Sequence, residues 1–262
     1  MKKRLMAAVL STAMAATMLL TGSISVQAAD AAAANDPAVE LIFTSVSVSG
    51  DSHTEAMYEF ADKVEELSGG SVTCKCYDNG SLFSSENEFD ALLNGDADLA
   101  YISFPTIATQ IPSYSMFASG YLFSSYEHMT SVLNGDIGLN KIRPQIEETL
   151  NIKPLSSFYL GSRVINTREK EINSYDDMNG LLLRMPNSEA WLFLGEALGA
   201  NPTPLSFSEL YTALQTGAVD AQDNPLPSIE SAKFYEVTNT SQSQTTLLTP
   251  SCHVSTVTHG TA

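Results

Sequence analysis

Positive charge is scarce in this chain of 262 residues. Thirteen Lys and Arg stand against thirty Asp and Glu, so the formal net charge is −17 at pH 7. Three of the cations, Lys2, Lys3 and Arg4, lie at the very start, which leaves ten cations beside all thirty acids in residues 29–262. Each contact with a phosphate needs a Lys or Arg. The composition therefore argues against binding to nucleic acid or to an anionic membrane surface.

Long apolar runs are also lacking, except for Leu5–Leu20. This run follows the three basic residues and precedes Val26-Gln27-Ala28, which has small side chains where a signal peptidase needs them. We predict a signal peptide over residues 1–28 and export to the periplasm or the extracytoplasmic face of the cell membrane. A retained membrane anchor stays open, although a spanning helix needs about 18 to 20 apolar residues. A lipoprotein would carry its lipidated Cys at the position of Ser23, and a Ser cannot be lipidated there.

Motifs for catalysis and metal binding are missing. The sequence has no Gly-x-Ser-x-Gly, His-Glu-x-x-His, Gly-x-x-x-x-Gly-Lys or Gly-x-Gly-x-x-Gly. Cys74 and Cys76 alternate along an expected strand without further Cys or His nearby, which is typical of small buried residues. The four His residues form no catalytic pattern, and His53 lies inside a helix-capping sequence. We predict no catalytic residue, no metal, no cofactor and no essential disulfide.

The chain does contain a regular alternation of strand and helix patterns. Strands are expected at 41–43, 71–77, 99–102, 152–159, 181–185 and 218–221. Helices are expected at 139–150, at 188–198, and after capping boxes that begin at Ser52, Ser85, Ser124 and Ser206, each with a Glu three residues later. Glycines such as Gly69, Gly95 and Gly217 are expected to end the helices. This rhythm predicts an α/β fold with largely parallel strands.

One pattern occurs twice. Ala91-Leu92-x-x-Gly95-x-x-Asp98 returns as Ala213-Leu214-x-x-Gly217-x-x-Asp220. In both places a helix is expected to end on Gly and lead directly into a strand. The repeat suggests equivalent corners in two similar lobes, and a cleft between two lobes is a common place for a small ligand.

Arg184 is the most informative residue, because it lies in the apolar strand pattern Leu181-Leu182-Leu183-Arg184-Met185. A desolvated guanidinium is costly without an anion, which is either a protein carboxylate or a ligand. Arg163 and Asn224 each follow an expected strand, where ligands of α/β folds gather. Two cations and an amide at strand ends make a reasonable carboxylate site.

The ordered motifs resemble one known family. The stretch GANPTPLSFSELYTALQTGAVDAQDNPLPSIESAKFYEV, residues 199–237, is similar to the solute-binding proteins of tripartite ATP-independent periplasmic (TRAP) transporters, the DctP family. Upstream pieces agree in order: Ser68-Gly69-Gly70, Gly95-x-x-Asp98, Gly161-Ser162-Arg163, Asp177-x-x-Gly180 and Arg184-Met185-Pro186. The resemblance covers about residues 40–237. It implies a two-lobed, type II periplasmic-binding-protein fold, with residues 29–158 mainly in lobe 1 and 159–237 mainly in lobe 2.

The resemblance also implies the site. The family's principal carboxylate-binding Arg falls on Arg184, its second Arg on Arg163, its Asn on Asn224, and its ligand-packing aromatic on Phe207. Members that bind sialic acid carry an Asn and two acids at positions that are Val46, Ser85 and Ser103 here. The resemblance thus disfavours sialic acid and favours a smaller or less hydroxylated acid. Ala221 and Asp223, in place of the usual Gly and Glu, are mild departures.

The C-terminal segment departs most from the family. Residues 238–262 contain no charged residue and twelve Ser or Thr, whereas the family continues into further strands and bracing helices. We interpret this segment as an atypical tail with little regular structure, after a truncation or frame shift near Val237. The C-terminal part of the fold is then missing, and we expect poor solubility and weak binding.

The sequence therefore predicts an exported, monomeric solute-binding protein. It would capture a small carboxylate, for example a C4-dicarboxylate, a 2-oxo acid or a uronate, and deliver it to TRAP permease subunits in the membrane. Two alternatives remain: an enzyme acting on the same acids, and a sensory receptor that presents its ligand to a kinase ectodomain.

Overall fold

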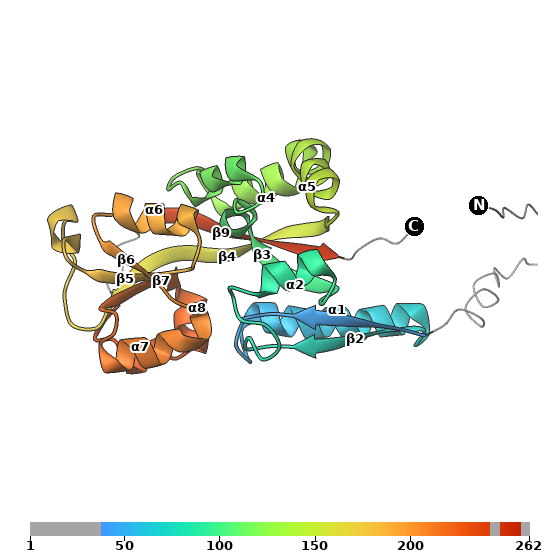
Figure 1. The fold of residues 1–262 in the computed structure, drawn as a ribbon, viewed down its shortest axis with the longest axis horizontal. Coiled ribbons are helices and arrows are strands. Elements are labelled where there is room, and N and C mark those ends of the chain that lie inside the picture. Colours follow the sequence, from blue (N-terminus) through green and yellow to red (C-terminus); the bar gives the residue numbers. More distant parts are fainter. Residues whose placement is uncertain (1–37, 242–246, 258–262) are drawn as a thin grey trace, which may run out of the picture. The chain divides into compact units, whose positions relative to one another are not determined.

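The computed structural model describes residues 38–241 and 247–257 (Figure 1). The predicted signal peptide lies outside the described residues. The described residues all belong to one compact unit. Its described part is a mixed α/β structure built on one sheet, whose strand order is β2-β1-β3-β9-β4-β7-β5-β6, with β8 paired to β4. The predicted α/β class is confirmed.

The strands are β1 (Val39–Thr44), β2 (Val72–Tyr77), β3 (Leu99–Ser103), β4 (Lys153–Thr167), β5 (Leu182–Met185), β6 (Asn201–Pro204), β7 (Ala221–Pro225), β8 (Thr240–Ser241) and β9 (Leu247–Val257). The α-helices are α1 (Ser52–Ser68), α2 (Glu88–Asn94), α3 (Phe104–Ile107), α4 (Tyr126–Asn134), α5 (Arg143–Leu150), α6 (Glu189–Ala197), α7 (Leu210–Thr216) and α8 (Leu226–Ser231). Short helical turns are η1 (Pro112–Ala118), η2 (Gly138–Ile142), η3 (Tyr175–Met178), η4 (Phe207–Glu209) and η5 (Phe234–Glu236).

The same five-element unit is built twice. In β1-α1-β2-α2-β3 the first strand pairs in parallel with the other two, and in β5-α6-β6-α7-β7 it does the same. The repeated sequence motif closes both units. Gly95 and Gly217 end α2 and α7 in the left-handed conformation, each with φ 79°. The Asp98 carboxylate then accepts a hydrogen bond of 2.8 Å from the Ile42 amide of β1. Asp220 accepts one of 3.0 Å from the Leu182 amide of β5.

Two predicted strand ends are wrong, and both concern the site. β4 does not stop at residue 159 but runs on to Thr167, past an irregularity at Tyr159–Ser162 in its pairing with β9. Gly161 has φ 138°, and a Cβ there would meet the Pro225 Cβ at 2.6 Å, so only Gly lets the strand continue. The last predicted strand begins at Ala221 rather than 218. Arg163 and Asn224 therefore lie within β4 and β7 and do not follow them.

The expectation of an irregular tail is also wrong for residues 247–257. They form β9, which lies between β3 and β4 and pairs antiparallel with both. Figure 1 shows β9 running beside β4. Strand pairing supplies backbone hydrogen bonds that a composition rich in Ser and Thr does not reveal. The predicted lobe boundary at residue 158 falls inside β4 and stays a prediction.

The helix starts were predicted within one to four residues. Asp51 caps α1 in place of Ser52, and Ser125 caps α4 in place of Ser124. Ser85 does not cap α2, which begins at Glu88 without a side-chain cap. The Ser206 hydroxyl bonds Glu209 and no backbone amide, and the helix there starts as η4. The predicted ends at Gly69, Gly95 and Gly217 are confirmed.

Four apolar clusters hold these elements together. The largest joins α2 to α5 against the sheet and includes Phe89, Phe104 and Met129. A second packs α6 on β5 through Trp191 and Leu183. The third unites α7 with Phe234, and the fourth packs Met57 of α1 on Phe43. Cys74 and Cys76 lie against this last cluster as free thiols, as expected.

Candidate functional site

A cavity of about 310 Å³ contains all seven residues that the sequence singled out as ligand-binding. They are Val46, Ser85, Ser103, Arg163, Arg184, Phe207 and Asn224. The cavity lies beyond the carboxyl ends of β1, β3 and β5, and β4 and β7 supply Arg163 and Asn224. Both repeated units contribute, because equivalent strands of each unit end at it.

Arg184 projects from β5 into the cavity and is only 2% exposed. Its Nε donates to the Leu205 carbonyl at 2.8 Å, and its guanidinium lies 5.9 Å from the centre of the Phe207 ring. Within the described part of the chain, no carboxylate lies within ion-pair distance of it. Burial, and then the charge of Arg163, lowers the pKa of Arg184 to about 9. Arg184 is thus still cationic at neutral pH and lacks a protein counterion among the described residues.

Arg163 is buried as well, but it has a protein counterion. Its Nε lies 2.7 Å from the Asp223 carboxylate, and its Nη2 donates to the Asp223 carbonyl. Its guanidinium also lies 4.6 Å from the centre of the Trp191 ring, a cation–π distance. The structural ion pair that was considered for Arg184 is therefore formed by Arg163, because β4 pairs with β7 and brings Asp223 beside it.

Asn224 is held in a buried amide chain. Its Nδ2 donates to Gln222 Oε1 at 2.6 Å, and Gln222 Nε2 donates to Asn166 Oδ1 at 3.2 Å. Its Oδ1 accepts from Arg163 Nη2 at 3.3 Å. These contacts fix the orientation of the Asn224 amide, and one N–H remains for a ligand.

The three positions that differ from sialic-acid-binding members line the opposite side of the cavity. The Ser103 hydroxyl lies 2.8 Å from the Thr106 hydroxyl at the start of α3. The Ser85 hydroxyl donates to Glu86 at 3.0 Å and accepts from the Phe207 amide at 3.5 Å. Ser85 and Phe207 belong to different repeated units, so this contact joins the two sides of the cavity.

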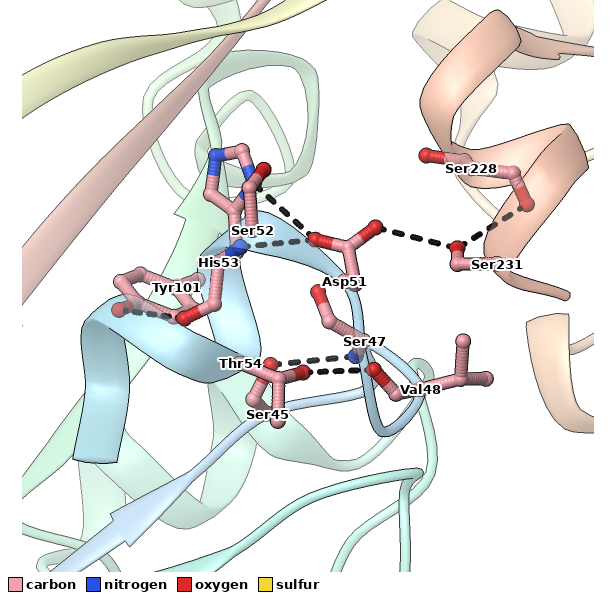
Figure 2. A network of polar contacts seen from close by, with 10 residues as sticks. All are labelled: Ser45, Ser47, Val48, Asp51, Ser52, His53, Thr54, Tyr101, Ser228 and Ser231. Carbon is pink, nitrogen blue, oxygen red and sulfur yellow. Dashed lines mark hydrogen bonds and ion pairs between the residues drawn. The ribbon is translucent and has the colours of Figure 1, made fainter.

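A further long-range contact joins Asp51 to α8, the helix that follows the second unit, as Figure 2 shows. Its Oδ1 accepts from the His53 amide at 2.8 Å and lies 3.3 Å from His53 Nδ1, while its Oδ2 accepts from the Ser231 hydroxyl of α8 at 3.3 Å. Burial opposes ionisation of Asp51, but the hydrogen bonds from His53 and Ser231 outweigh it and lower its pKa. The predicted local role of His53 agrees with this packing.

Glu88, the first residue of α2, also lines the cavity, and sequence reasoning assigned it only a capping role. It is 3% exposed, and its Oε1 has no hydrogen-bond partner. The Thr44 hydroxyl lies close but makes no well-formed bond either. Burial raises the pKa of Glu88 to about 8. The sequence signal that could have revealed Glu88 is its spacing of four residues from Leu92. Residues at this spacing share one face of a helix, so an acid is expected there on the apolar face.

Comparison with known proteins identifies the family. The profile of "Bacterial extracellular solute-binding protein, family 7" (DctP) matches residues 43–254. The chain belongs to this DctP family. The match extends beyond the predicted limit at residue 237 and includes most of β9, so the segment up to residue 254 is not foreign to the family.

Curated relatives agree with the DctP assignment. The sialic acid-binding periplasmic protein SiaP of Vibrio cholerae is 35% identical over 177 residues, which are 68% of this chain and 54% of that protein. A solute-binding protein of Roseobacter denitrificans is 34% identical and shares 70% of this chain and 55% of its own length. The chain thus spans slightly more than half the length of these relatives.

Solved structures place the fold in the same family. A TRAP periplasmic solute-binding protein of Roseobacter denitrificans with bound 3-deoxy-D-manno-oct-2-ulosonic acid is 39% identical, with a TM-score of 0.77 over 84% of this chain and 72% of that one. One of Sulfurospirillum deleyianum with bound succinate is 26% identical, with a TM-score of 0.74 over 85% of this chain and 70% of that one. The two-lobed, type II periplasmic-binding-protein fold is confirmed.

Metal-ligand groups and membrane-spanning helices are both missing from the described residues. Within the described ranges, no His, Cys, Asp and Glu side chains gather into a group that could hold a metal ion. In the same residues, no helix has the length and apolarity needed to cross a membrane. Members of the DctP family are extracytoplasmic binding proteins rather than enzymes.

Proposed function

We propose that this chain is an extracytoplasmic solute-binding protein that captures a small organic acid by its carboxylate and delivers it to a TRAP-type membrane permease. The observation that carries the proposal is Arg184. It is a buried cation in a cavity and has no protein carboxylate beside it among the described residues. A buried guanidinium without an anion is costly, so we propose that an anionic ligand is the counterion of Arg184.

Each of the other residues has a role in this proposal. Arg184 pairs with the ligand carboxylate, and Arg163 adds charge while it is held by Asp223. Asn224 donates its remaining N–H, and the Phe207 ring packs against ligand carbons. The two repeated units close on the ligand. Ser85–Phe207, between the units, and Asp51–Ser231, between the first unit and α8, are contacts that such closure forms. Several solved relatives hold a bound acid, among them succinate and glucuronate, which is consistent with a carboxylate ligand.

We further propose that sialic acid is not a ligand. At Val46, Ser85 and Ser103 the cavity lacks the Asn and the two acids that the resemblance implies at these positions of sialic-acid-binding members.

A calorimetric titration tests both statements. The protein is unfolded, freed of bound ligand, refolded and titrated with succinate, 2-oxoglutarate, glucuronate, gluconate and N-acetylneuraminate. We expect at least one acid to bind and N-acetylneuraminate to give no signal. Binding of none of the acids would contradict the proposed function, and tight binding of N-acetylneuraminate would contradict the specificity.

A further inference from the structure

Only one of the two cations that line the cavity has a protein carboxylate as its counterion among the described residues. The described residues that line it include two cations, Arg163 and Arg184, and no Lys or His. Arg163 is already paired with Asp223. The cavity can therefore neutralise one ligand carboxylate, at Arg184, and offers no cation to a second one.

The wall formed by the starts of α1 and α2 is acidic and rich in hydrogen-bonding groups. The acids that line the cavity are Asp51, Glu86, Glu88 and Asp90. Neutral polar side chains that line the cavity from residues 46–110 are Ser47, Ser85, Ser103, Thr106, Thr109 and Gln110. A second carboxylate would meet like charge here, whereas ligand hydroxyl groups would find both donors and acceptors.

Glu88 is the one of these acids that is buried without a partner for Oε1. An unsatisfied buried carboxyl oxygen is costly, and a ligand hydroxyl that reaches it removes the cost. Because burial raises the pKa of Glu88 to about 8, the neutral carboxyl can both donate and accept at pH 7. Neither role requires a charge on the ligand.

We infer that the ligand is a monocarboxylate with hydroxyl groups along the rest of its carbon chain, and that Glu88 selects it by hydrogen-bonding one of those hydroxyls. This inference rests on the proposed function and narrows its ligand class. Arg184 holds the carboxylate, and Glu88 and the neighbouring Ser and Thr hydroxyls hold the polyol part. Dicarboxylates are excluded because their second charge has no counterion.

Matched acids test the ligand class. D-gluconate and D-galactonate differ from D-glucarate and galactarate only in that the last carbon is a neutral CH2OH rather than a carboxylate, and hexanoate lacks the hydroxyls. We expect at least one aldonate to bind tenfold or more tightly than its dicarboxylate partner and than hexanoate. A dicarboxylate that binds as tightly as the better aldonate overturns the inference but leaves the proposed function intact. If no acid binds, both fail.

Variants of Glu88 test its role. Glu88→Met removes the polar group at similar size, and we expect the affinity for the aldonate to fall about tenfold while that for hexanoate stays the same. Glu88→Gln keeps hydrogen-bonding groups and should stay within about threefold of the original. Asp96→Asn makes the same acid-to-amide substitution at an exposed residue just after the end of α2, and should alter nothing. Equal losses for aldonate and hexanoate in Glu88→Met overturn the role.

A pH profile keeps the test decisive if Glu88→Met does not fold. The ionisable groups that share the cavity with Glu88 are Asp51, Glu86, Asp90, Tyr101, Arg163 and Arg184. Above about pH 8 Glu88 ionises and adds negative charge beside an anionic ligand, so affinity should fall in the unaltered protein. Glu88→Gln should keep its affinity through pH 8 and lose it only near pH 9, where Arg184 deprotonates in both proteins. Identical profiles would overturn the assignment of Glu88.

Discussion

Two buried arginines in one cavity illustrate how a single neighbour decides the role of a charge. Arg163 and Arg184 are 4% and 2% exposed, and each lies near an aromatic ring. Asp223 contacts Arg163 at 2.7 Å, whereas Arg184 has a carbonyl but no carboxylate partner among the described residues. The first arginine therefore has an anion within the fold, whereas the second has none among the described residues.

The charge of Arg184 is less important to the site than its geometry. In Arg184→Lys the cation remains, but the planar fork that can bind a carboxylate through two N–H groups is lost. We expect the affinity for the acid found by calorimetry to fall by roughly 1.5–3 kcal/mol. Arg168→Lys, the same change at a residue that does not line this cavity, serves as the control. Unchanged affinity in Arg184→Lys would make that arginine a structural residue.

Glu88 should make the stability of the ligand-free protein depend on pH. Its pKa is raised from 4.5 to about 8 by burial, so between these values the folded state holds a proton that the unfolded state has lost. Stability should therefore fall as pH rises from about 4.5 to 8, by 5 kcal/mol at most if each pKa unit counts about 1.4 kcal/mol. Urea unfolding at pH 5, 6.5 and 8 measures the slope. Glu88→Gln should remove this part of it, and an unchanged slope would show that Glu88 is ionised in the fold.

Among the elements, the start of α1 shows a cap that serves two purposes. Asp51 has an extended backbone with φ −73° and ψ 144°, accepts from the His53 amide, and also accepts from Ser231 on α8. Ser52, which the capping-box pattern favours, is exposed instead. Because Asp is as good a cap as Ser, local sequence alone does not decide between adjacent candidates.

Substitution at these two positions distinguishes the caps. Asp51→Ala should lower the free energy of unfolding by about 1–2 kcal/mol, since it removes the cap and the contact with Ser231. Ser52→Ala should change it by less than about 0.5 kcal/mol. Chemical denaturation of both variants is the measurement, and the opposite ranking would place the cap at Ser52.

The repeated helix–strand corners show that a short motif can specify a structural unit. Asp98 and Asp220 each accept a hydrogen bond from an amide of the first strand of their own unit. In both units the preceding glycine adopts φ 79°, where residues with a Cβ are strained. The Gly-x-x-Asp spacing thus specifies both the turn that ends the helix and the hydrogen bond from the Asp to the first strand.

At the scale of the whole molecule, β9 connects the two halves of the sheet. It pairs with β3 on one side and β4 on the other, so it joins the strands of the first repeated unit to those of the second. Without it both neighbours would present an unpaired edge, which favours aggregation. The lack of charge in residues 238–262 suits a strand inside a sheet better than a solvated tail.

Deletion tests the role of β9. A chain that lacks residues 247–262 should give little soluble protein and no cooperative melting, because the edges of β3 and β4 are exposed. Removing only residues 258–262 leaves β9 in place and should keep the melting transition of the complete chain. Soluble yield and thermal unfolding by circular dichroism compare the two. Equal behaviour would mean that β9 contributes little to the fold.

The sequence by itself determined those features that depend on local backbone preference and short-range periodicity. The α/β class, the helix ends at Gly69, Gly95 and Gly217 and the unusual position of Arg184 follow from residues within a few positions of one another. Arg163 and Asn224 were proposed from expected strand ends, and the resemblance to the family added Phe207, Val46, Ser85 and Ser103. The structure brings all seven together.

Only the tertiary structure decided which charges are paired. Arg163 meets Asp223 across 60 positions of the chain, Asp51 meets Ser231 across 180, and β9 reaches its place between two strands far from it in the sequence. Glu88 becomes a cavity residue because α2 packs where β1, β4 and β5 also arrive. Such long-range contacts depend on the burial and pairing of distant segments, so local sequence patterns do not predict them.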